Sequence, residues 1–105
     1  MEGTLSQLAA LPPQARIAIL GCGPIGLSVM LPARLQGVAA VYATDRIEAR
    51  LTVARRGGAD WTGSPDREDV VHAILDREPL QLDAVFECCG RQEALDAELA
   101  ALRAT

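Results

Sequence analysis

The chain contains 105 residues, of which 10 are Lys or Arg and 14 are Asp or Glu, for a net charge of −4. This length allows a single domain, and the acidic balance argues against a nucleic-acid or membrane partner, because clustered cations bind such partners. Hydrophobic residues make up 50% of the chain and aromatic residues 3%, so we expect a core of Ala, Val, Leu and Ile.

Residues 1–13 precede the first predicted strand. Three leucines recur at helical spacing before Pro12 and Pro13, which predicts a short helix packed on the sheet. The segment lacks the basic start and long apolar stretch of a secretion signal, and no run approaches the length of a membrane span. We therefore expect a soluble, cytoplasmic protein.

An apolar strand, predicted over 17–20, leads directly into a glycine-rich loop. A continuous apolar run is typical of a parallel strand buried on both faces. The loop reads Gly21-Cys22-Gly23-Pro24-Ile25-Gly26. In this Gly-x-Gly-x-x-Gly pattern, Gly21 allows a tight turn, Gly23 leaves space for a pyrophosphate, and Gly26 lets the next helix lie close to the strand.

A helix is predicted from Pro24 to Gln36. Pro24 suits its first position, so the amides of Ile25 and Gly26 are expected to donate to the phosphates. The helix is apolar on nearly every side, a pattern typical of a helix covered on both faces. The sheet would cover one face, so we expect the other to be left partly exposed. Pro32 inside it predicts a kink, because the missing hydrogen bond and crowded turn cost about 3 kcal/mol.

A second predicted strand, 38–44, is followed directly by Asp45, about 20 residues beyond the glycine loop as the dinucleotide-binding pattern requires. A carboxylate at this position accepts hydrogen bonds from the hydroxyls of the adenosine ribose. A structural turn or a methyltransferase loop shows similar glycines, but the latter usually has an acid where Leu20 stands. Strand, loop, helix and acid in this order favour dinucleotide binding.

The remaining chain continues to alternate helices and strands. We expect a helix that ends at Gly57-Gly58, a strand over 59–62, a helix that contains His72, a strand over 82–88 and a last helix marked by Leu95, Leu99 and Leu102. This alternation predicts an α/β fold, a partial doubly wound Rossmann fold with a parallel sheet of about four strands in the order 3-2-1-4 and helices on both faces. The exposed sheet edge and the apolar helix 24–36 predict a homo-oligomer.

The single histidine and the three cysteines receive no chemical role. His72 has no Ser, Cys or acidic partner placed beside it by spacing, so we expect a solvated side chain. An odd number of cysteines argues against a disulfide framework. One histidine and no Cys-x-x-Cys motif argue against a metal site.

Several stretches resemble the zinc-type medium-chain alcohol and polyol dehydrogenases. They are 19–27, Thr44-Asp45-Arg46, Arg50-Leu51, Gly58-Ala59-Asp60 and Phe86-Glu87-Cys88-Cys89-Gly90. The resemblance implies the NAD-binding portion of an NAD-dependent dehydrogenase, which passes hydride between a primary or secondary alcohol and the nicotinamide. A stand-alone, non-catalytic nucleotide-binding module is the alternative.

The resemblance also implies roles for individual residues. Asp45 and Arg50 would contact the ribose and adenosine, and Ile25 would pack near the dinucleotide. One wall of the cofactor cleft would be formed by Cys88, Cys89, Gly90 and Arg91. Arg50 has an alternative as a surface partner of Asp45 or Glu48.

Arg46 is open to two interpretations, stacking on adenine or binding a 2′-phosphate. Asp45 would repel that phosphate, because two unit charges 4 Å apart repel by about 4 kcal/mol at an effective dielectric constant of about 20. We therefore expect NAD rather than NADP. The resembled enzymes hold zinc in a separate catalytic domain whose ligand motifs do not occur here. Residues 1–105 then form a truncated dinucleotide-binding domain with no catalytic or metal residue, inactive by itself.

Overall fold

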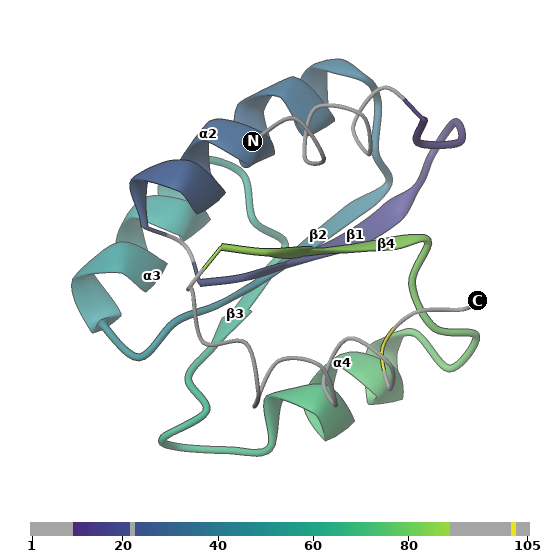
Figure 1. The fold of residues 1–105 in the computed structure, drawn as a ribbon. Coiled ribbons are helices and arrows are strands. Elements are labelled where there is room, and N and C mark those ends of the chain that lie inside the picture. The colour runs from purple at the N-terminus through teal and green to yellow at the C-terminus, as the bar shows by residue number, and fades with distance from the viewer. Residues whose placement is uncertain (1–9, 22, 89–101, 103–105) are drawn as a thin grey trace.

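A parallel β-sheet of four strands runs through the middle of the molecule (Figure 1). The computed structural model describes residues 10–21, 23–88 and 102 of the chain. The strands are β1 (Arg16–Leu20), β2 (Ala40–Thr44), β3 (Trp61–Gly63) and β4 (Ala84–Glu87). Their order is β3-β2-β1-β4 and each neighbouring pair is parallel, which confirms the sheet expected from the sequence.

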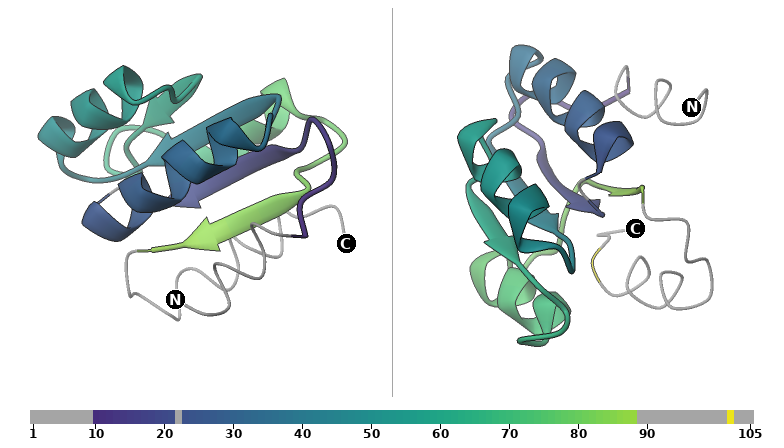
Figure 2. Two further views of the ribbon diagram at one scale, coloured as in Figure 1. Left: turned by 90° about the horizontal axis from the view of Figure 1, so that it is seen from above. Right: turned by 90° about the vertical axis from the view of Figure 1, so that its left-hand side faces the viewer.

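Helices cover both faces of this sheet. They are α2 (Pro24–Leu35), α3 (Glu48–Arg56) and α4 (Val70–Arg77). The first two lie on one face and α4 lies on the other (Figure 1, Figure 2). Of the helices described, none is long and apolar enough to cross a bilayer. The helix expected before Pro12 and most of the expected last helix lie outside the described residues.

Alternate strand residues enter two separate cores. The core under α2 and α3 joins apolar residues of three strands and both helices, among them Ile17, Ile19, Val41, Ala43, Phe86, Val29, Met30 and Leu51. The core under α4 contains Ala18, Leu20, Tyr42, Val85, Ile74, Leu82 and Leu102. Leu102 is fully buried, and its carbonyl accepts a hydrogen bond from the Leu82 amide at 2.8 Å. The chain beyond β4 therefore returns to the face that α4 covers.

The helix α2 buries only one side. Val29 and Met30 lie in the core, whereas Ile25, Leu31 and Leu35 are 49%, 63% and 80% exposed. The partly exposed apolar face expected from the sequence is therefore present. The helix continues through Pro32 to its end, and the kink at this proline stays a prediction.

The third strand begins two residues later than the sequence indicated. Asp60 stands before it and its carboxylate accepts from the Val41 amide at 2.7 Å, while the Ala59 amide bonds to the Ala54 carbonyl at the end of α3. Both residues thus complete the turn after Gly58, whose φ of +111° suits glycine. The predicted helix end at Gly57-Gly58 is confirmed.

A buried carboxylate links the start of the sheet to the end of α4. Glu78 is 6% exposed. Nη1 of Arg16 donates to its two oxygens at 2.9 and 2.7 Å, and the Tyr42 hydroxyl donates to Oε2. Burial and this hydrogen bond raise the pKa of Tyr42 to about 12. The cluster ties β1, β2 and α4 together, and the sequence patterns gave no indication of it.

The interpretation of His72 as a residue without an acidic partner is wrong. Asp69 is the N-cap of α4, and its carboxylate accepts from the His72 amide at 3.1 Å and lies 2.9 Å from Nδ1 of the imidazole. An N-cap side chain reaches the third helical residue by its ordinary geometry. The imidazole is still 80% exposed, so the expected solvated position is confirmed.

Replacing Asp69 by Asn is expected to lower the pKa of His72 toward its usual value of 6.5. The hydrogen bond with Asp69 raises the pKa of His72, and the same bond lowers the pKa of Asp69 from 3.8. The contribution of His72 to stability is full below pH 6.5 and is lost as the pH rises through its raised pKa. That of Asp69 is present above pH 3.8 and is lost as the pH falls through its lowered pKa. An NMR titration of the single histidine measures the shift, and an unchanged pKa in the variant would contradict the contact.

Candidate functional site

The glycine loop lies where the carboxyl ends of β1, β2 and β4 meet. Gly21 has a φ of +88°, and its amide donates to the Thr44 carbonyl at the end of β2 at 2.8 Å. On the other side, the Cys88 amide donates to the Leu20 carbonyl at 2.9 Å. The strand order reverses between β1 and β4, which is where open parallel sheets bind ligands. The structure thus brings Gly21 and Cys88 to one edge.

Gly26 lets α2 begin against β1. A Cβ at this position would lie 2.3 Å from the Gly21 carbonyl oxygen and 3.1 Å from Cγ2 of Ile19. No side chain heavier than that of glycine fits there without moving the backbone. The close helix–strand packing expected from the third glycine of the motif is therefore present.

Gly23 has a different environment. It is the N-cap of α2 and has extended backbone, and the three atoms nearest to a Cβ placed on it all belong to the guanidinium of Arg50, at 3.5 Å or more. The space in front of Gly23 therefore borders on one flexible side chain. The second glycine of the motif is not required by the packing of the fold.

The first turn of α2 faces the same space. Pro24 occupies its first position, and none of the first-turn residues is acidic. Because the amides of a first turn have no partners within the helix, those of Ile25 and Gly26 are donors for an anion, and the helix dipole favours one there. Ile25 itself is half exposed.

Asp45 is held rigidly after β2. Its side chain is 7% exposed, and Oδ1 accepts from the Ile47 amide at 2.9 Å in a turn that begins α3. Oδ2 lies 3.7 Å from Nη1 of Arg50. Arg50 stands in the first turn of α3 and reaches back, so that its guanidinium lies between Asp45 and Gly23. The pairing of Arg50 with Asp45, one of the two alternatives from the sequence, is present in this structure.

Glu48, the other partner considered for Arg50, pairs with different cations. Its carboxylate lies 2.8 Å from Nη2 of Arg55 and 3.0 Å from Nη1 of Arg67. The hydrogen bond from Arg55 lowers the pKa of Glu48. Arg67 belongs to the loop between β3 and α4, so Glu48 connects that loop to the start of α3.

Arg46 also turns toward that loop. Its Nε lies 3.5 Å from Oδ1 of Asp66, and both side chains are more than half exposed. Asp66 could not be singled out from the sequence, because nothing near it in the sequence distinguishes it from other exposed acids. Only the pairing of β2 with β3 places the segments that follow these strands side by side.

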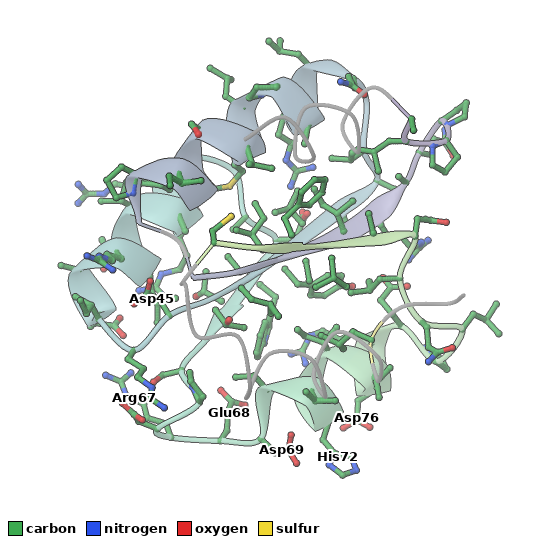
Figure 3. All side chains as sticks on the ribbon, in the orientation of Figure 1. Asp45, Arg67, Glu68, Asp69, His72 and Asp76 are labelled. Atoms are coloured by element: carbon green, nitrogen blue, oxygen red, sulfur yellow. The ribbon has the colours of Figure 1, made fainter. Side chains whose placement is uncertain are left out.

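Side chains of the outer surface of α4 lie apart from this edge. Figure 3 shows Asp45 near α3, and Asp69, His72 and Asp76 together along the outer side of α4. Cys88 is half-buried and packs against the core under α2. Cys89, Gly90 and Arg91, predicted to complete the cleft wall, lie outside the described residues. Within the described part of the chain, no three His, Cys, Asp or Glu side chains are grouped as metal ligands.

Residues 24–105 match the sequence family described as zinc-binding dehydrogenase. The chain belongs to this family. Among its relatives, a sorbitol dehydrogenase of Arabidopsis thaliana is 34% identical over 100 residues, which cover 90% of this chain and 28% of the relative. An L-threonine 3-dehydrogenase of Bacillus subtilis is 36% identical over 96 residues, covering 89% and 27%. The family resemblance drawn from the sequence is confirmed.

Solved structures of the family share the fold. The 2R,3R-butanediol dehydrogenase of Bacillus subtilis matches with a TM-score of 0.85 and 27% identity, covering 95% of this chain and 29% of that one. A zinc-binding dehydrogenase of Sinorhizobium meliloti, solved with NADP bound, matches with a TM-score of 0.85 and 31% identity, covering 95% and 30%. The chain spans less than a third of the length of each of these four dehydrogenases.

Alanine at Gly26 is expected to destabilise the fold more than alanine at Gly23 does. The added methyl group at Gly26 would meet a backbone oxygen at 2.3 Å, and such overpacking costs about 1–3 kcal/mol, more than the gain of about 1 kcal/mol from helix propensity. At Gly23 no atom is in the way, and only the preference of the N-cap for glycine over alanine is lost, which costs less than about 1 kcal/mol. Urea denaturation of the two variants measures both free energies of unfolding. Equal midpoints would show that α2 can move away from β1 at no cost.

Proposed function

We propose that this chain binds the adenosine and pyrophosphate part of a nicotinamide dinucleotide at the carboxyl edge of its sheet, and that it prefers NAD to NADP. One observation carries the proposal. Gly23 and Asp45 border a common space, and the side chain that lies between them is the flexible Arg50. A site for a phosphate and a site for a ribose are thus next to each other, with a cation between them.

The residues present fit such a ligand. Gly21 and Gly26 place the first turn of α2 beside the end of β1, and Gly23 adds no side chain in front of it. The pyrophosphate would be held by the amides of Ile25 and Gly26, next to Pro24, whose missing N–H costs nothing there. The space that a Cβ at Gly23 would fill is the strongest structural support for this role.

Asp45 would hold the ribose. One of its oxygens is already bound to the Ile47 amide, which fixes the carboxylate, and the other faces the same space as Gly23. A fixed carboxylate accepts hydrogen bonds from the two ribose hydroxyls without further ordering and repels a 2′-phosphate. Arg50 would exchange its contact with Asp45 for contacts to the nucleotide. Arg46 would lie beside the adenosine, and Cys88 with Cys89, Gly90 and Arg91 would form the opposite wall.

We further propose that residues 1–105 form the first part of the dinucleotide-binding domain of an NAD-dependent alcohol or polyol dehydrogenase. Membership of the zinc-binding dehydrogenase family supports this, as do relatives named for the oxidation of sorbitol, L-threonine and L-idonate. In such an enzyme the bound nicotinamide supplies the hydride acceptor or donor. The chain covers less than a third of these relatives, so we propose that zinc and substrate are held by other parts of the complete enzyme.

Replacing Asp45 by Ala is expected to weaken NAD binding about 10- to 100-fold, because hydrogen bonds to a charged group contribute about 1.5–3 kcal/mol. NADP binding should weaken less, because the repulsion of its 2′-phosphate disappears with the carboxylate. Titration calorimetry with both cofactors measures the two losses. Asp76→Ala, on the outer side of α4 (Figure 3), is the control. Equal losses for NAD and NADP would remove Asp45 from the ribose site.

Replacing Gly23 by Val is expected to abolish cofactor binding and to leave the fold intact. The branched side chain would take the space of the pyrophosphate, while its nearest protein neighbour, the Arg50 guanidinium, can move aside. Circular dichroism and a binding titration on the same sample separate the two effects. A folded variant that binds NAD normally would show that the loop is only a structural turn.

A further inference from the structure

Two ion pairs connect the loop between β3 and α4 to the start of α3, and the loop supplies the acid of one pair and the cation of the other. Arg46 pairs with Asp66 of the loop at 3.5 Å, and Glu48 pairs with Arg67 of the loop at 3.0 Å. The two segments are far apart in the sequence but adjacent in space, because β2 and β3 are paired strands. The loop therefore borders the same edge of the sheet as Asp45.

The position of Asp66 does not depend on Arg46. Its amide donates to Oγ of Ser64 at 3.2 Å, and the amides of Arg67 and Glu68 donate to the Ser64 carbonyl at 3.0 and 3.2 Å. Ser64 is 3% exposed, so this turn is anchored in the interior. The Glu48–Arg67 pair fastens the turn a second time. A change in the Asp66 side chain should therefore leave the loop in place.

Asp66 thus carries a negative charge on an anchored turn next to Arg46, the residue that directly follows Asp45. On the basis of the proposed function, Arg46 is the cation best placed to meet a phosphate on the 2′ oxygen of the ribose. In sites that accept NADP, a nearby arginine plays this part. Here the guanidinium already has a carboxylate partner, that of Asp66.

We propose that Asp66 is a positioning residue that sets the preference of this site for a ribose without a 2′-phosphate. It acts through Arg46, which it draws toward the β3–α4 loop and partly neutralises. A 2′-phosphate carries a charge of about −1.5 to −2 at neutral pH, so it is disfavoured when Arg46 is partly neutralised, whereas a ribose hydroxyl is not.

The test compares two probes of the adenosine half, AMP and adenosine 2′,5′-bisphosphate, by titration calorimetry on the full chain. Asp66→Asn is expected to raise the affinity for the bisphosphate about 3- to 10-fold, because it removes the charge that partly neutralises Arg46 in an exposed ion pair. The affinity for AMP should stay the same within error. Glu68→Gln is the matched control, because it removes the same charge from the same loop (Figure 3) and should not alter the ratio of the two affinities.

Arg46 must be present for the effect. In the background Arg46→Gln, the same Asp66→Asn change should raise the affinity for the bisphosphate less than twofold. If Asp66→Asn fails to fold by circular dichroism, Asp66→Ala replaces it, since the turn uses only the amide of this residue.

The possible results separate this inference from the proposed function. Equal changes for the two probes, or a full gain without Arg46, would overturn the role of Asp66 while leaving nucleotide binding intact. Binding of neither probe by the unchanged chain would overturn the proposed function and the role of Asp66 with it. An unchanged ratio in Asp66→Asn with normal AMP binding would overturn the role of Asp66 alone.

Discussion

The close approach of α2 to β1 is the constraint on which the carboxyl edge of the sheet depends. A Cβ on Gly26 would lie 2.3 Å from the Gly21 carbonyl, so the helix can begin here only because that atom is missing. Gly21, with its positive φ, turns the chain sharply enough to use this short distance. As a result, the first-turn amides of α2 and the bare backbone of Gly23 stand directly beyond the end of β1.

Charges of both signs alternate along this edge. Arg50 reaches Asp45 from α3, and Arg46 reaches Asp66 from the next loop. The two arginines are about half exposed, whereas the carboxylate of Asp45 is buried against the Ile47 amide. Asp45 is therefore the charged side chain of this edge that is held in place by burial and a backbone hydrogen bond. The cations around it are long side chains that can take up other positions when an anion arrives.

Much of the fold could be predicted from the sequence, because periodicity and glycine spacing report on strands, helices and the turn at Gly21. The strand order followed from the β-α alternation and the rule for doubly wound sheets. The contacts between segments far apart in the sequence could not be predicted. Glu78 with Tyr42, and Arg46 with Asp66, depend on which turns the sheet brings together. The partner of His72 could have been predicted from the sequence, because Asp69 stands at an N-cap position three residues before it.

In the binding that we propose, an ion pair within the protein would be replaced by an ion pair with the nucleotide, and no unpaired charge would lose its hydration. Arg50 would leave Asp45 for the nucleotide, so part of the attraction between cation and phosphate offsets a contact that already exists. Exposed pairs of this kind contribute at most about 1 kcal/mol. The glycine backbone and the helix amides would then supply affinity that NAD and NADP share, and small differences among the arginine pairs would decide between them. Discrimination of this kind can be changed by one charged residue in a neighbouring loop, without any change at the glycines.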